Sequence, residues 1–257
     1  TYNITRMPMD RPYNLGTPKE IFLESIRTAL RRTEGPPDTR RANLIQTKEE
    51  LQELANSIEL SASKNRDALS MDLAHTASLG GWNVYTAHNN EDVLNYINTV
   101  ASKWSTTTLS RSDQPVFSNY PIDTGLIKLG YDITTITHNN ESAARVLLRE
   151  NIIASGIGIT GADYAVAETG SIVLMPRAGI SRLVSVVPPV HIALVRKQDI
   201  LSSIDDVLLL RRLDHYNNGD MGSYLNFITG PSRTADIEQT IVVGVHGPKE
   251  VHMVLLD

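Results

Sequence analysis

Short runs of apolar and β-branched residues alternate with amphipathic helical segments through most of this chain, and no other feature of the sequence constrains the fold as strongly. Alternating strands and helices are typical of an α/β fold with a largely parallel sheet. Three further runs near the end predict strands that extend this sheet in an antiparallel or mixed manner. We predict strands at 83–87, 106–109, 131–137, 152–160, 171–175, 190–195, 224–229, 240–245 and 251–256, and helices at 89–102, 116–129, 139–149 and 203–213.

The first 80 residues have only helical character. Thr17-Pro18-Lys19-Glu20 starts a helix, with Thr as N-cap and Pro at the first helical position. Thr47-Lys48-Glu49-Glu50 is a second capping box, and the apolar spacing after it predicts one long helix that ends near Gly80-Gly81. We therefore predict an N-terminal helical extension, 1–80, and an α/β domain, 81–257.

Charge and cysteine content exclude several classes of function. The 257 residues hold 24 Lys and Arg against 29 Asp and Glu, so no basic excess is available for nucleic acid. They hold no cysteine, which excludes disulfides, thiolate-bound metal and iron–sulfur clusters, and thiol nucleophiles. The histidines lack ligand spacing, so we predict no metal site, although a carboxylate-bound Mg²⁺ stays open. The apolar stretch Leu183–Val195 is too short and broken to span a membrane, and we expect a cytoplasmic protein.

The densest group of glycines and polar side chains, at 160–171, follows a predicted buried strand. Its hydroxyls suit an anionic ligand, and so do its backbone N–H groups, which the glycines leave open to close approach. Glu168 is a candidate acid–base catalyst if burial raises its pKa. A helix cap at the start and a tight turn at Gly170 explain the same residues equally well. The candidate ligand-binding residues of this segment are Thr160, Asp163, Thr169, Gly170 and Ser171.

A second polar group lies at 230–238, after a predicted strand. Arg233 is a fork-shaped donor that suits a carboxylate or phosphate, although it also has acidic neighbours with which it can pair. Arg182, farther back in the chain, is a second candidate clamp for an anion or simply a solvated charge. The candidate ligand-binding residues of the second segment are Ser232, Arg233, Thr234 and Asp236.

Three segments together resemble the LUD-domain family, also called the LutC/YkgG lactate-utilisation family. They are ITGADYAVAETGS from Ile159, RLVSVVPPVH from Arg182, and GPSRTADIE from Gly230 with GVHGP from Gly244. The resemblance covers residues 80–257. It implies a three-layer α/β fold similar to the NagB/RpiA/CoA-transferase-like superfamily and a part in oxidising L-lactate to pyruvate.

The resemblance also implies partners. LutC-like proteins act with an iron–sulfur LutB-like protein and a LutA-like protein that carries cysteine-rich CCG domains, so we expect no cofactor in this chain and iron–sulfur clusters only in the partners. Glu168-Thr169-Gly170 invites comparison with the Glu-Asn-Gly nucleophile of some CoA transferases, but the Asn is missing.

We therefore expect a component of a lactate-utilisation system that binds a small anionic ligand. Whether the chain itself is catalytic stays open. The alternatives are an independent enzyme that acts on a sugar phosphate or a CoA ester, and a non-catalytic scaffold subunit whose N-terminal helices dock partners.

Overall fold

The computed structural model describes residues 19–29, 47–136, 142–177, 179–180, 182–219, 224–235 and 241–257. The chain divides into two units, 1–46 and 47–257. In the first unit the described residues form helix α1 (Lys19–Ala29). In the second unit the elements are α2 (Lys48–Lys64), α3 (Arg66–Gly80), β1 (Asn83–Ala87), α4 (Asn90–Lys103), β2 (Thr108–Arg111), α5 (Val116–Asn119), α6 (Ile122–Lys128), β3 (Asp132–Thr135), α7 (Ser142–Ala154), β4 (Ile157–Gly161), β5 (Tyr164–Val166), β6 (Ser171–Leu174), α8 (Arg182–Val186), β7 (Val190–Arg196), β8 (Ile200–Leu201), α9 (Ile204–Asn218), β9 (Asn226–Ile228), β10 (Arg233–Ala235), β11 (Ile241–Val243) and β12 (Glu250–Leu256).

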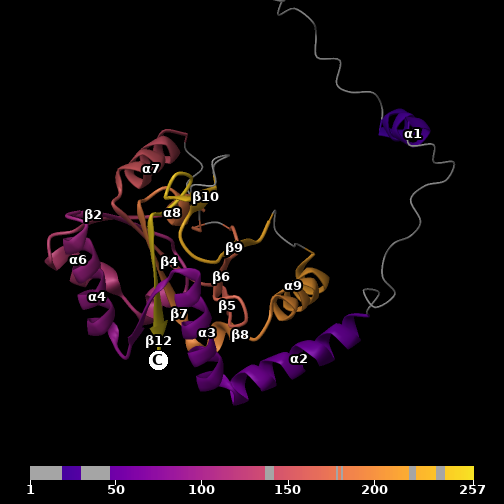
Figure 1. Cartoon of the computed structure of the whole chain (residues 1–257), viewed down its shortest axis with the longest axis horizontal. Coiled ribbons are helices and arrows are strands. Elements are labelled where there is room, and N and C mark those ends of the chain that lie inside the picture. Colours follow the sequence, from indigo (N-terminus) through magenta and orange to yellow (C-terminus); the bar gives the residue numbers. More distant parts are fainter. Residues whose placement is uncertain are drawn as a thin grey trace, which may run out of the picture. The chain divides into compact units, whose positions relative to one another are not determined.

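A six-stranded parallel sheet forms the centre of the second unit, with the order β1-β12-β7-β4-β2-β3 among the described residues (Figure 1). The two longest strands, β7 and β12, lie side by side in it, and six of the seven residues in each are buried. Parallel strands that are covered on both faces require such continuous apolar runs. The run at 251–256, which we predicted as an extension of the sheet, therefore lies inside it.

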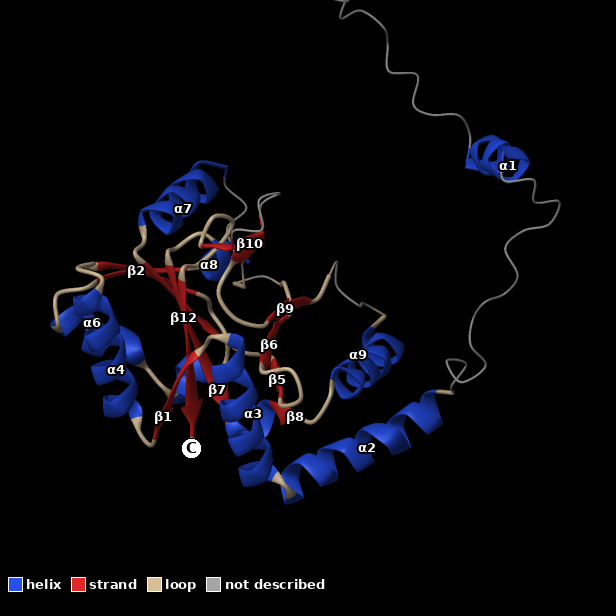
Figure 2. Ribbon diagram, viewed as in Figure 1, coloured by secondary structure: helices blue, strands red, loops and turns tan. Residues whose placement is uncertain are grey.

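Two further layers cover this sheet (Figure 2). Helix α4 and the short helices α5 and α6 pack on one face, where Val93, Ile97 and Leu126 meet the apolar side chains of β4 and β7. A second sheet, β8-β5-β6-β9, and helix α3 cover the other face, where Leu73 and Ala77 join the core. This arrangement confirms the predicted three-layer α/β fold.

The long helix that the sequence predicts before Gly80 is two helices. Asn65 ends α2 and begins α3 with a non-helical backbone (φ −108°, ψ 19°), and its side-chain N–H donates to the Ser61 carbonyl. The apolar spacing continues across this break because both helices pack on the same domain. Helix α2 packs against α9 through Leu51, Ala55 and Leu213.

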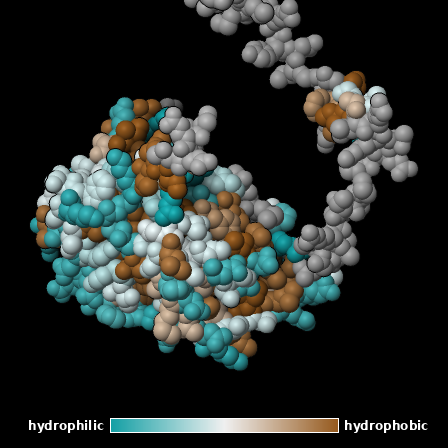
Figure 3. Space-filling model, viewed as in Figure 1, coloured by the Kyte–Doolittle hydropathy of each residue, from teal (hydrophilic) through white to brown (hydrophobic). Residues whose placement is uncertain are grey.

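The predicted strand at 152–160 is shorter than expected, because Ile152 to Ala154 complete helix α7 and the strand begins at Ile157. The outer side of α7 is apolar as well: Val146 and Leu147 are exposed there, and Figure 3 shows apolar side chains gathered at the top of the view over this helix. An apolar run with one buried and one exposed helical face is easily mistaken for a strand.

Gly170 fixes the distance between the second sheet and α3. Its φ is +64°, a conformation that side chains disfavour, and a Cβ atom here would lie 2.4 Å from the backbone nitrogen of Ala77. The turn before β6 therefore lies directly on the last turns of α3, and any larger residue would push the two apart.

We expect Gly170→Ala to lower the free energy of unfolding by about 1–3 kcal/mol more than Gly219→Ala does. Both glycines have positive φ, so both variants carry the conformational cost of about 1 kcal/mol, but a Cβ at Gly219 meets nothing within 4 Å. Urea denaturation of the two variants measures the difference. Equal losses would show that the contact with α3 is not tight.

Candidate functional site

Three hydroxyl groups join the turn before β6 to the end of β9. The Thr169 hydroxyl donates to Ser171 Oγ at 2.8 Å, and Ser171 Oγ lies 2.8 Å from Thr229 Oγ1. Ser171 is buried, while Thr169 is partly exposed. These contacts hold the first predicted segment, 160–171, beside the start of the second.

The end of α3 completes this meeting point. Arg233 Nη2 donates to the Gly80 carbonyl at 3.1 Å, and a Cβ atom on Gly80 would lie 3.1 Å from the Thr229 carbonyl oxygen. A Cβ on Gly81 would lie only 2.7 Å from Arg233 Nη2. We call this cluster, formed by Gly80–Gly81, Thr169–Ser171 and Thr229–Arg233, the glycine-loop junction.

A loop from the end of the chain connects the junction to α8. The Ser232 N–H donates to the Pro248 carbonyl, and the Ser232 carbonyl accepts from the Gly244 N–H. A Cβ on Gly247 would touch Ser232 at 3.1 Å and the Val186 carbonyl at 3.9 Å, so α8 lies directly beyond this loop. Thr234 pairs with Val242 in the β10–β11 hairpin. Asp236 lies outside the described residues.

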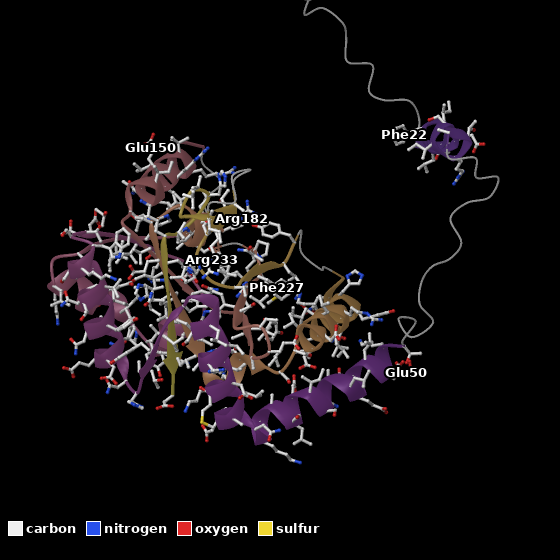
Figure 4. The ribbon with its side chains drawn as sticks, in the orientation of Figure 1. Phe22, Glu50, Glu150, Arg182, Phe227 and Arg233 are labelled. Carbon is white, nitrogen blue, oxygen red and sulfur yellow. The ribbon has the colours of Figure 1, made fainter. Side chains whose placement is uncertain are left out.

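The two candidate arginines lie on different elements: Arg233 is part of the junction, whereas Arg182 lies on α8, whose last residue borders the loop at Gly247. Arg182 begins α8 and its guanidinium lies 5.7 Å above the centre of the Tyr224 ring, a cation–π contact that fixes its position. Arg233 begins β10. Both are exposed, and within the described ranges neither forms an ion pair with a carboxylate. Figure 4 shows both side chains on the part of the domain where α8 and β10 lie.

Glu168 has a structural contact of its own. Its Oε1 accepts the backbone N–H of Ile204 at 2.7 Å, so the carboxylate lies at the N-terminus of α9, where unpaired N–H groups attract negative charge. The described residues give its other oxygen no hydrogen-bond donor. Glu168 therefore binds α9 whereas Arg233 binds α3, and an acid–base role for Glu168 stays a prediction.

Both carboxylate oxygens of Asp163 also have hydrogen-bond partners. One carboxylate oxygen accepts the Met175 N–H at 2.6 Å and the other accepts Arg177 Nη2 at 2.8 Å, and only 6% of the side chain is exposed. These bonds fasten the segment after β6 to the end of β4. Asp163 thus holds the backbone near the carboxyl edge of the sheet, away from the junction.

Thr160 lies in the core, where its hydroxyl is 2.9 Å from His191 Nε2. Burial, with a smaller effect of His252, lowers the pKa of His191 to about 3, so the imidazole is neutral at pH 7. The Trp82 ring lies 6.1 Å from that of His191. Thr160 and His191 therefore form a buried polar pair under the junction and do not reach its surface.

Sequence reasoning missed Gly80, Gly81 and Thr229 as contributors to the junction, and it missed Tyr224 as the ring beneath Arg182. The Gly-Gly pair was recognisable only as the end of a helix, and neither Tyr224 nor Thr229 lies in a recognisable motif. In the described ranges no group of His, Asp and Glu side chains is placed to hold a metal ion. None of the described helices has the length and apolar character that crossing a membrane requires.

The family model of the LUD domain matches residues 77–256. The chain belongs to the LUD domain family. Among curated relatives of this LUD protein, "Lactate utilization protein C" of Halalkalibacterium halodurans is 42% identical over 101 residues, which are 39% of this chain and 44% of that protein. The protein of the same name from Bacillus subtilis strain 168 is 38% identical over 102 residues, or 40% of this chain and 42% of that one. The chain thus spans less than half the length of these relatives.

A solved structure supports the fold. A DUF162 family protein from Deinococcus radiodurans superposes with a TM-score of 0.51 and 17% identity, covering 75% of this LUD chain and 98% of that protein. At this identity the likeness concerns the α/β fold alone.

The buried His191 predicts a pH dependence of stability. In the unfolded chain the His191 imidazole takes up a proton near pH 6.5, whereas in the folded chain it stays neutral down to about pH 3. The free energy of unfolding therefore falls as the pH drops from 6.5 towards 3. For one proton, the free energy of unfolding falls by at most about 1.4 kcal/mol per pH unit. Urea denaturation at pH 7 and pH 5 should show a smaller fall in His191→Gln than in the wild type. His75→Gln, which replaces an exposed histidine of α3, is the control, and an equal fall in both variants would contradict this origin.

Proposed function

We propose that this LUD protein takes part in lactate utilisation, as a LutC-like component that supports the oxidation of L-lactate to pyruvate. The names of its curated relatives support this proposal, and so does the LUD family match over residues 77–256. The chain's own part is to bind a small anionic ligand at the glycine-loop junction.

The observation that carries the ligand proposal is the pair of exposed guanidinium groups, Arg182 and Arg233, which have no carboxylate partner among the described residues. Lactate and pyruvate each carry one carboxylate, and a guanidinium fork binds a carboxylate through two charge-assisted hydrogen bonds. The nearby hydroxyls of Thr169 and Ser232 suit the second functional group of either acid, a hydroxyl or a keto oxygen.

The oxidation of lactate to pyruvate releases two electrons and two protons, and these electrons need an acceptor. The 257 residues hold no cysteine, so a thiolate-bound cluster has to lie outside them. We propose that iron–sulfur LutB-like and CCG-domain LutA-like proteins supply it, and that this chain works beside them.

Growth on lactate tests the proposed function. In the organism that makes this chain, deleting its gene should slow growth on L-lactate and leave growth on pyruvate unchanged, because only the oxidation step is lost. Arg182→Gln or Arg233→Gln should restore growth poorly, whereas Arg149→Gln, an exposed arginine of α7, should restore it fully. Normal growth of the deletion strain on L-lactate would refute the proposal. Full restoration of growth by both arginine variants would show that Arg182 and Arg233 are not needed for this function.

The acid–base role of Glu168 has a separate test. Glutamine keeps an oxygen that accepts the Ile204 N–H but cannot exchange a proton, so Glu168→Gln should leave thermal stability unchanged while lactate-dependent electron transfer by the assembled proteins falls at least tenfold. Unchanged electron transfer in this stable variant would show that Glu168 has no acid–base role and that its contact with α9 is purely structural.

A further inference from the structure

The hairpin formed by β10 and β11 is a sheet of its own. Among the described residues β11 pairs only with β10, and the two strands join neither the six-stranded nor the four-stranded sheet. A two-stranded hairpin is only marginally stable in water unless a third strand or another element packs on it. In Figure 1 the hairpin lies at the upper side of the domain, where β10 is labelled near α8. Its second strand, β11, therefore offers an edge to which a further strand can be added.

Both faces of β11 are exposed. Ile241 and Val243 point to one side of the hairpin and Val242 to the other, because successive side chains of a strand alternate. The exposed fractions are 65% for Ile241, 44% for Val242 and 43% for Val243. Natural proteins protect an exposed edge with a charged side chain, a proline or a bulge, and none of these occurs within Ile241–Val243. Such an unprotected apolar strand is typical of an interface.

The hydrogen bonds of the hairpin show which backbone groups of β11 face outward. The Gly244 N–H donates to the carbonyl of Ser232, the residue directly opposite it in the register. In an antiparallel ladder, hydrogen-bonded and non-hydrogen-bonded pairs alternate, so Val242 is bonded to β10 whereas Ile241 and Val243 are not. The N–H and C=O groups of Ile241 and Val243 therefore point to the outer edge, and the described part of the chain gives them no partner there.

This outer edge is complementary to itself. When two copies of β11 lie antiparallel about a two-fold axis at Val242, Ile241 of each copy is opposite Val243 of the other, and each such pair exchanges two backbone hydrogen bonds. The two Val242 side chains then face each other on one side of the sheet, and the Ile241 and Val243 side chains pair on the other side. The strand carries no charge, so like charges do not meet in this arrangement, and a charged segment of another protein would find no counter-charge on it.

We propose that β11 is a self-association surface, through which two copies of this chain form one antiparallel sheet in the order β10-β11-β11-β10. In this sheet β10 forms both outer edges, and its exposed Arg233 disfavours the addition of further strands. The assembly therefore closes at two copies. Because Arg233 belongs to the glycine-loop junction, the shared sheet carries one junction from each copy. The proposal does not depend on the role in lactate utilisation.

Sedimentation velocity of the whole chain, from low micromolar to near-millimolar concentration, tests the self-association. The strand is much smaller than a standard interface of about 20–30 residues a side, so we expect a weak dimer that forms as the concentration rises. Val242→Lys places two ammonium groups directly opposite each other and should weaken the dimer at least about tenfold. Val146→Lys, the same change at an exposed valine of α7, should leave the dimer unchanged. A monomer at every concentration would refute the proposal, and so would a dimer that the two variants affect equally.

Cysteine cross-linking tests the register, because the chain has no cysteine of its own. On the two-fold axis the Cα atoms of the two copies of residue 242 lie about 4.5 Å apart, within the range that a disulfide spans. Val242→Cys should therefore form a covalent dimer on mild oxidation, and a thiol reductant should reverse it.

Two single-cysteine variants serve as controls for this register. Val243→Cys should not cross-link, because residue 243 faces Ile241 of the other copy and its own counterpart lies beyond the about 7 Å that a disulfide tolerates. Val146→Cys on α7 measures cross-linking by random collision. Cross-linking of Val242→Cys no faster than that of Val146→Cys would refute the pairing, and faster cross-linking of Val243→Cys than of Val242→Cys would refute this register.

Discussion

The pairing of β7 with β12 is the interaction on which the rest of this LUD protein depends. These strands are buried along almost their whole length and join segments from distant parts of the chain into one sheet. The loop that leads into β12 reaches the glycine-loop junction, and the residues at which the two strands end, Arg196 and Leu256, line a pocket beside the start of α3. A shift of one residue in this register would turn apolar side chains to the wrong face and separate both groups of loops.

Close backbone approach, more than charge, assembles the junction. Gly80, Gly81 and Gly170 each lie where a Cβ atom would collide with another segment or come unusually close to it, so α3, the turn before β6 and the end of β9 meet with little space between them. The arginines then stand at the edge of a rigid framework. A rigid framework is useful for recognition because binding a ligand costs little ordering of the protein.

Several predicted site residues proved to have structural contacts, and the reason is general. Asp163 and Glu168 are acceptors next to exposed backbone N–H groups, and such groups attract carboxylates whether or not a ligand is present. Ligand-binding glycine loops and structural turns use the same residue types. The structure brings together two of the predicted segments, at Thr169 to Ser171 and at Arg233, and their role in ligand binding stays a prediction. The sequence alone did not separate the residues that hold the loops from those that face solvent.

The amino-acid sequence by itself determined the α/β class, the positions of most helices and strands, and the family, because apolar periodicity, capping residues and long motifs are local properties. Only the tertiary structure decided that the last strand lies inside the sheet, between β1 and β7, that a second sheet covers one face, and that the end of α3 joins the two polar segments. These outcomes depend on which distant surfaces of the chain bury each other, because the residues of a strand do not by themselves specify the strands with which it pairs.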